Sequence, residues 1–199
     1  FVTLINRIDF IMLERMTEPA QLGFYSAAYR ITNLLESLPI MMMATLFPLM
    51  SHFTEKDHKR LTRIYTKSNL LFTGLGIVMG FIITVLSPLL IRLLFGSAFE
   101  QAIQGLQVLI WSTVFLYFGI TAVYLLISAR KEFINLFILI PATLLNIALN
   151  WYLIPKMGFV GAAWATVAAF TVLFLLNQWM AYRYLKSLPA NSESDGDQA

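Results

Sequence analysis

Five long apolar stretches occupy most of this 199-residue chain and constrain its fold more than any other feature. Each is long enough to cross a bilayer as a helix, because about 20 mostly apolar residues cover a hydrocarbon core of about 30 Å. With 58% hydrophobic and 13% charged residues, the chain predicts an integral membrane protein that has no sizeable soluble domain. The stretches are residues 24–50, 69–94, 106–127, 133–154 and 160–181.

Residues 1–16 have an apolar, helical composition but are too short to span a membrane. They end at a charged turn, and at about 1.5 Å per residue Phe1 would lie roughly 20 Å inside the bilayer. We therefore interpret them as part of an additional spanning helix that begins before Phe1. Counted along the chain, this helix is the first of six spans and the stretch 24–50 is the second. The predicted fold is all-α, a polytopic transmembrane bundle of six spans in residues 1–188. Residues 189–199 are small, polar and acidic, which predicts a disordered tail.

The distribution of basic residues predicts how the spans are oriented. Nine of the 14 lysines and arginines lie in the connections after the second, fourth and sixth spans, whereas each opposite connection has one. Connections rich in lysine and arginine face the cytoplasm, so we expect the tail to be cytoplasmic as well. The nine residues are Lys56, Lys59, Arg60, Arg63, Lys67, Arg130, Lys131, Arg183 and Lys186.

Several classes of function are disfavoured. The chain has no cysteine, which excludes disulfides and cysteine-ligated metals. Its basic residues are spread over connections and are not interleaved with aromatics, so nucleic acid is not an expected partner. No nucleophile elbow, zinc-protease motif or phosphate-binding loop is present, and we expect neither an enzyme nor a cofactor. His52 and His58 lie in a charged segment that we interpret as a solvated loop, not as a metal site.

Four charged side chains lie inside predicted spans and away from their ends: Arg7, Asp9, Arg30 and Glu36. A central arginine costs roughly 2.5–3.5 kcal/mol in a membrane helix, so Arg30 should face a water-filled cavity or an acidic partner. Two roles are open for Arg30: it lines the cavity, or it forms an ion pair with Asp9 or Glu36. Arg7 and Asp9 could likewise neutralise each other. A carboxyl group in a low dielectric can load and unload a proton, which makes Glu36 a candidate for ion coupling.

Polar residues form stripes on the second, fourth and fifth spans when residues are placed at 100° per position. Such stripes either line a polar cavity or hydrogen-bond neighbouring helices, for a net gain of about 0.6 kcal/mol per bond. For the fourth and fifth spans alone, hydrogen bonding is the favoured interpretation. The stripes are Ser26, Arg30, Asn33 and Ser37; Thr113, Tyr117, Thr121, Tyr124 and Ser128; and Asn135, Thr143, Asn146 and Asn150.

Small residues mark the third and sixth spans. The third contains Gly76 and Gly80, and the sixth has Gly161, Ala165 and Ala169 at four-residue steps. Small side chains at this spacing let two helices approach closely. We assign both spans to the scaffold of the bundle.

Short motifs recur in order along nearly the whole chain up to the tail. They are Asp9 before an apolar run, Gly23-x-Tyr25-x-x-Ala28, Phe47-Pro48, Leu94-Phe95-Gly96 with Phe99 and Ala102, Asn150-Trp151-Tyr152-Leu153-Ile154-Pro155, and Gly158-x-x-Gly161-Ala162-Ala163. Together they resemble the C-terminal half of Wzx-type polysaccharide flippases, which belong to the multidrug, oligosaccharidyl-lipid and polysaccharide exporter superfamily.

The resemblance implies one half of a MATE-like transporter, in which two six-helix bundles open alternately to the two sides of the membrane. The other, N-terminal bundle would be a partner in the same protein. The implied activity is flipping of an undecaprenyl-pyrophosphate-linked oligosaccharide across the bacterial inner membrane. The glycan would serve O-antigen and lipopolysaccharide, capsule or exopolysaccharide assembly, and polysaccharide polymerase machinery is a further expected partner.

The resemblance also suggests roles for residues. Arg30 and Arg7 could bind the anionic pyrophosphate through forked N–H donors. Asp9 and Glu36 are the candidates for coupling to a proton or sodium gradient. The further expected substrate contacts are Asn33, Tyr117, Tyr124, Asn146 and Asn150.

Two alternatives stay open. A cation-coupled drug antiporter of the same superfamily would need acidic groups that face the cavity, whereas the charges inside these spans are balanced. A membrane polysaccharide ligase or polymerase usually has a large outer loop that carries catalytic charges. The outer connections here, residues 17–23, 95–105 and 155–159, are short, which favours the flippase.

Overall fold

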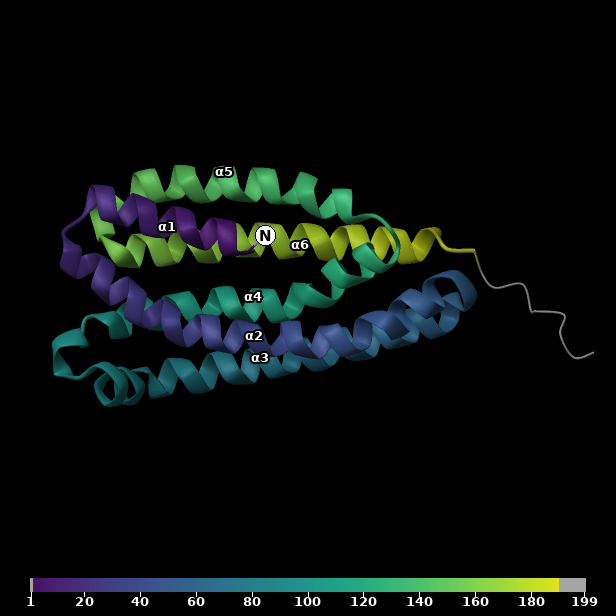
Figure 1. Cartoon of the computed structure of the whole chain (residues 1–199), viewed down its shortest axis with the longest axis horizontal. Helices are drawn as coiled ribbons and strands as arrows, with labels where there is room; N and C mark the ends of the chain where they lie inside the picture. The colour runs from purple at the N-terminus through teal and green to yellow at the C-terminus, as the bar shows by residue number, and fades with distance from the viewer. Residues whose placement is uncertain (1, 190–199) are drawn as a thin grey trace, which may run out of the picture.

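The computed structural model describes residues 2–189, with side chains from residue 7 onward, and it contains no strand in that range. The all-α prediction is confirmed, and five of the helices are long and apolar enough to cross a membrane. Figure 1 shows all six helices running along one common axis. They are α1 (Val2–Met16), α2 (Pro19–Lys56), α3 (His58–Phe95), α4 (Ala102–Ser128), α5 (Glu132–Met157) and α6 (Phe159–Ser187), with a 3-10 turn, η1 (Ser97–Phe99), before α4.

Helices α2 and α3 form a hairpin that is longer than a membrane is thick. Each has 38 residues, which corresponds to about 57 Å of helix against a hydrocarbon core of about 30 Å. Their turn lies at one end of the bundle (Figure 1). Of the predicted tail, only Pro189 lies within the described residues.

The predicted loop around His52 and His58 is wrong, because both residues are helical. Only Asp57 interrupts the helix there, and its carboxylate accepts a hydrogen bond from the backbone N–H of Arg60 at 2.9 Å. This is an N-terminal cap of α3. The surrounding lysine, arginine, glutamate and leucine residues favour helix, so a single capping residue is enough to reverse the chain.

Helix α4 lies at the centre and packs against α2, α3 and α6. Two of the glycines of α3, Gly76 and Gly80, approach α4 closely. A Cβ atom on Gly76 would lie 2.6 Å from the Cβ of Tyr117, and one on Gly80 would lie 2.5 Å from Cγ2 of Val114. The third span is therefore a packing element, as predicted, because only glycine lets α3 come this near.

Helices α5 and α6 form a second hairpin. Gly158 turns the chain between them with a φ of +58°, a left-handed conformation that favours glycine. A Cβ atom on Gly161 would lie 2.5 Å from the carbonyl oxygen of Leu153. Ala165 and Ala169 are fully buried. The predicted packing role of the small residues of the sixth span is thus confirmed.

In helix α5 the asparagine side chains are buried and several large apolar ones are exposed, which is the opposite of the distribution in a soluble protein. Its asparagines Asn135, Asn146 and Asn150 are buried, whereas Phe137 and Trp151 are 74% and 71% exposed. An apolar exposed face with polar groups inside is stable only where the surroundings are lipid. The side-chain arrangement therefore supports the membrane assignment independently of composition.

Candidate functional site

Asp9 is the focus of the buried polar residues. Its side chain is fully buried on α1. One carboxylate oxygen, Oδ2, accepts hydrogen bonds from the hydroxyls of Tyr25 (2.7 Å) and Thr166. The other, Oδ1, accepts from the amides of Asn146 (3.0 Å) and Asn150 (2.6 Å). These five residues, which we call the Asp9 cluster, come from α1, α2, α5 and α6.

Local structure explains how the four donors reach one carboxylate. Asn146 and Asn150 are four residues apart on α5, so they lie one above the other on the same face. Thr166 stands on α6, where Ala162 and Ala163 are fully buried and leave room for the neighbouring helices. The amide of Asn150 also donates to Oδ1 of Asn146 at 3.1 Å. The donors therefore hold one another as well as Asp9.

Among residues 7–189, no basic side chain neutralises Asp9. Within the described residues the ion pairs join Arg60 to Asp57, Arg92 to Glu100 and Arg130 to Glu55, and all three lie on the surface. An isolated buried charge is expensive, and four neutral donors repay only part of that cost. A carboxyl group in this position is most stable when it carries a proton or when a cation lies beside it.

The cluster offers oxygen atoms that suit a small hard cation. Besides the carboxylate, the hydroxyls of Tyr25 and Thr166 and the side-chain oxygen of Asn146 are at hand. The side-chain oxygen of Asn150 is buried and has no hydrogen-bond partner in the part of the chain that the structure describes. The described residues hold no group of three or more histidine and acidic side chains, so the arrangement fits a monovalent cation or a proton better than a divalent metal.

Glu36 is the second buried acid and lies apart from the cluster. It is 5% exposed on α2, and its Oε1 accepts a hydrogen bond from Thr113 on α4 at 3.4 Å. Nearby, the Tyr117 hydroxyl donates to the Leu35 carbonyl oxygen at 3.0 Å. Glu36 is therefore held more loosely than Asp9, and within residues 7–189 no hydrogen bond connects the two sites.

Arg7 and Arg30 are exposed on this chain, and neither forms an ion pair with a residue in the range 7–189. The ion pairs of Arg30 with Asp9 or Glu36, and the neutralisation of Asp9 by Arg7, are thus absent from the structure. Asn33, one turn beyond Arg30, is exposed too and accepts a hydrogen bond from the Tyr29 hydroxyl at 3.3 Å. The second-span stripe therefore lies on an open face of α2.

The other stripes are mostly inside the bundle. Tyr117 is buried on α4 and bonds α2, as the helix-to-helix interpretation predicts. Tyr124 is half-buried, with its ring 5.9 Å from that of Phe47 in an edge-on arrangement. Asn146 and Asn150 are fully buried against Asp9. Contact of these four residues with a substrate stays a prediction.

Sequence reasoning missed Tyr25 and Thr166 as members of the site. Tyr25 belongs to the motif Gly23-x-Tyr25-x-x-Ala28, but its separation of 16 residues from Asp9 in the sequence does not indicate that the two side chains are in contact. Thr166 is one hydroxyl in an apolar helix, 157 residues from Asp9. No signal in the sequence singles it out, since threonines in membrane helices commonly bond their own backbone.

Comparison with known proteins adds a family assignment. The family described as MatE matches residues 1–152. An uncharacterized membrane protein of Methanocaldococcus jannaschii is 26% identical over 92% of the chain. The probable low-salt glycan biosynthesis flippase Agl15 of Haloferax volcanii is 26% identical over 85% of the chain. The chain spans 36% of the length of each of these relatives. No solved structure matches it significantly.

Proposed function

Because the chain belongs to the MatE family, we propose that it forms one bundle of a transporter that flips a lipid-linked oligosaccharide across a membrane, driven by a proton or cation gradient. The observation that carries the proposal is the Asp9 carboxylate, which is fully buried with four neutral donors and no basic partner in the described residues. Such a group can bind and release a cation, which is what coupling requires. Transport is thus the proposed activity, in place of catalysis.

Loading Asp9 with a proton changes the hydrogen bonds that tie α1 to α6. The charged Oδ2 atom accepts from both hydroxyls, whereas a protonated Oδ2 becomes a donor, so one hydroxyl must turn away. Thr166 has a second acceptor within reach, the Ala162 carbonyl oxygen at 3.1 Å. In the proposal, this exchange weakens the contact between α1 and α6. Under this proposal, helix α1 can then move relative to the rest of the bundle.

The open face of α2 is the proposed place for the pyrophosphate of the substrate. Arg30 is exposed and free of any carboxylate in the described range, so its planar guanidinium can form two parallel hydrogen bonds with an anion. Arg7 and Asn33 are exposed as well. A lipid-linked substrate is supported by the resemblance to polysaccharide flippases and by the relative described as a probable glycan biosynthesis flippase.

The other residues predicted to contact the substrate differ in how deeply they are buried. Asn146 and Asn150 are engaged by Asp9, which favours a role in coupling over direct contact with sugars. Tyr124 is half-buried and can reach a substrate with a small movement. Tyr117 is buried and bonds α2. Among the predicted substrate contacts, Arg7, Arg30 and Asn33 are the ones that the geometry favours most.

The wider setting is part of the same proposal. The chain would pair with an N-terminal bundle of its own protein in a bacterial inner membrane, with its carboxyl end in the cytoplasm. O-antigen, capsule and exopolysaccharide assembly are the candidate destinations, and polysaccharide polymerase machinery is a candidate partner. The Wzx-type assignment rests on the sequence motifs.

Coupling is tested at Asp9. The full-length protein with Asp9→Asn should lose the stimulation of flipping by an imposed gradient in proteoliposomes, because asparagine fills the same space but cannot carry the charge. Proton and sodium gradients are imposed separately, and Glu36→Gln is measured in parallel as the second candidate. Asp57→Asn removes a surface acid and serves as the control. If Asp9→Asn responds to both gradients as the wild type does, coupling at this residue is refuted.

Substrate binding is tested at Arg30. Arg30→Ala should abolish glycan export in a flippase-deficient strain at near-normal membrane abundance, and Arg30→Lys should restore only part of it, because an ammonium keeps the charge but loses the planar fork. Arg15→Ala, at an exposed arginine in the last turn of α1, is the control. Since Arg30 and Asp9 form no ion pair here, combining Arg30→Ala with Asp9→Ala should not recover export. Recovery in that double variant would count against substrate binding.

A further inference from the structure

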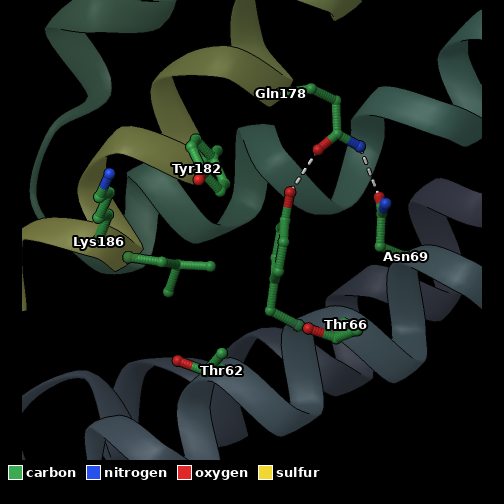
Figure 2. A pocket seen from close by; sticks show the side chains of 8 residues that line it. Thr62, Thr66, Asn69, Gln178, Tyr182 and Lys186 are labelled. Atoms are coloured by element: carbon green, nitrogen blue, oxygen red, sulfur yellow. Dashed lines mark hydrogen bonds between the residues drawn. The ribbon is translucent and has the colours of Figure 1, made fainter.

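A pocket that has several polar side chains in its lining lies between α3 and α6, away from the Asp9 cluster. It has a volume of about 520 Å³. Both helices pack on α4, so the pocket opens over the central helix at the end of the bundle where α3 begins and α6 ends. Figure 2 shows its lining side chains from α3 below and α6 above. The lining residues are Thr62, Tyr65, Thr66, Asn69, Gln178, Tyr182, Leu185 and Lys186.

A fixed network forms the floor of the pocket. Gln178 donates to the side-chain oxygen of Asn69 at 2.6 Å and to the Phe118 carbonyl oxygen at 2.5 Å. The Tyr65 hydroxyl donates to the side-chain oxygen of Gln178. Both N–H groups and the oxygen of Gln178 are therefore occupied, and this residue ties α3, α4 and α6 together. Figure 2 shows the two bonds between pocket residues as dashed lines.

The network leaves an excess of donors for a ligand. Because the oxygen of Asn69 accepts from Gln178, its amide nitrogen keeps two N–H groups, for which no acceptor appears in residues 7–189. Thr66 is exposed and its hydroxyl is likewise free to donate. Lys186 stands at the rim and forms no ion pair with any described residue. The lining contains one cation and no carboxylate, so its chemistry favours an anion.

The surroundings of the pocket identify the source of the anion. Just past Asn69, Leu70 is 74% exposed and belongs to the apolar outer face of α3. Lys67 and Arg63, about one and two turns before Leu70, are exposed. The pocket thus straddles the boundary between the apolar and the charged surface. A phospholipid places its phosphate at this same boundary, next to its acyl chains, and interfacial tyrosines such as Tyr182 are typical there.

We propose that the pocket between α3 and α6 binds the headgroup of an anionic phospholipid from the leaflet on this side of the membrane. The phosphate accepts from the amide of Asn69 and the hydroxyl of Thr66, Lys186 closes over it from the rim, and the acyl chains lie along Leu70 and the outer face of α3. A basic, hydroxyl-lined pocket between membrane helices suits such a headgroup. The site is independent of the proposed transport activity.

The test uses the full-length protein, purified in mild detergent and titrated with phosphatidylglycerol or with phosphatidylcholine of the same chain length. Native mass spectrometry counts the lipids retained. The wild type should retain phosphatidylglycerol in preference to phosphatidylcholine. Lys186→Gln should weaken the binding of phosphatidylglycerol about fivefold, the value expected for one lysine near an anionic lipid surface. Lys186→Gln together with Thr66→Val should abolish the preference.

Lys156→Gln is the matched control, because it removes one exposed lysine at the opposite end of the bundle, where Lys156 lies over the Tyr152 ring at 3.4 Å. It should leave phosphatidylglycerol binding unchanged. Equal losses in Lys156→Gln and Lys186→Gln would overturn the proposal, since they would show a general charge effect. Retention of undecaprenyl phosphate but not of phosphatidylglycerol would overturn it too, because the pocket would then serve the carrier lipid.

Discussion

The close approach of α4 and α6 at Gly119 predicts a large effect of adding a single methyl group. A Cβ atom on this residue would lie 2.4 Å from the Cβ and 2.3 Å from Cδ1 of Phe174. Carbon atoms in contact are normally about 3.5–4.0 Å apart, so the two helices must separate by about 1 Å. Because the Cβ of Phe174 is fixed to its backbone, a change of rotamer cannot relieve the clash. Gly119→Ala should therefore displace α6.

The expected loss in free energy of unfolding can be taken from other proteins in which a packed core was overfilled. Forcing extra carbon into a packed interior typically costs about 1–3 kcal/mol. Gly74→Ala is the matched control, because a Cβ at that exposed position on α3 meets no atom within 4 Å. It should stabilise the helix by about 0–1 kcal/mol. The two variants add the same methyl group and should differ in free energy of unfolding by about 1–4 kcal/mol.

The assay is reversible unfolding of the full-length protein by SDS in mixed micelles, followed by circular dichroism. Phe174→Ala should be destabilising alone, because it empties a buried site. Combined with Gly119→Ala it should cost less than the sum of the two single changes, because the contacts with Cγ and Cδ1 are then removed, although the contact with the Cβ of residue 174 remains. The reasoning is refuted if Gly119→Ala is as stable as the wild type, or if the two changes are additive.

Three further predictions concern the Asp9 cluster, the orientation and the unit of activity. Asp9→Ala leaves the amides of Asn146 and Asn150 without their acceptor and should lower the free energy of unfolding by about 2–6 kcal/mol, at about 1–3 kcal/mol per buried donor. Asp9→Asn can accept from the amides and donate to the hydroxyls. Equal losses of stability in the two variants would contradict this account. A cysteine at position 57 should resist an impermeant thiol reagent applied from outside, whereas one at position 97 should react, and the opposite pattern would reverse the orientation. The 199-residue chain expressed alone should not export glycan, because the proposed cavity needs walls from two bundles, and export by the chain alone would sink that idea.

The membrane fold could be read from the sequence because lipid imposes a simple rule. Every spanning segment must be apolar and must satisfy its own backbone, so helices of about 20 residues are expected wherever hydropathy is sustained. Small residues at four-residue steps then mark the close contacts, and Gly76, Gly80 and Gly161 proved to lie at such contacts. The loop predicted around His52 and His58 is reduced to Asp57 alone, because the lysine, arginine and glutamate residues beside it are charged but also favour helix.

The candidate site was only partly accessible from sequence. Asp9, Asn146 and Asn150 attract attention as polar groups in apolar helices, and the period of the helix shows that the two asparagines share a face. Their meeting with Asp9 depends on the order and rotation of the helices, over a separation of 137 and 141 residues. Periodicity gives the faces of each helix but not which faces meet. The tertiary structure decided that Asp9 is held by four neutral donors, and that Arg30 lies on an open face and not beside it, because only packing fixes which polar side chains share one buried space.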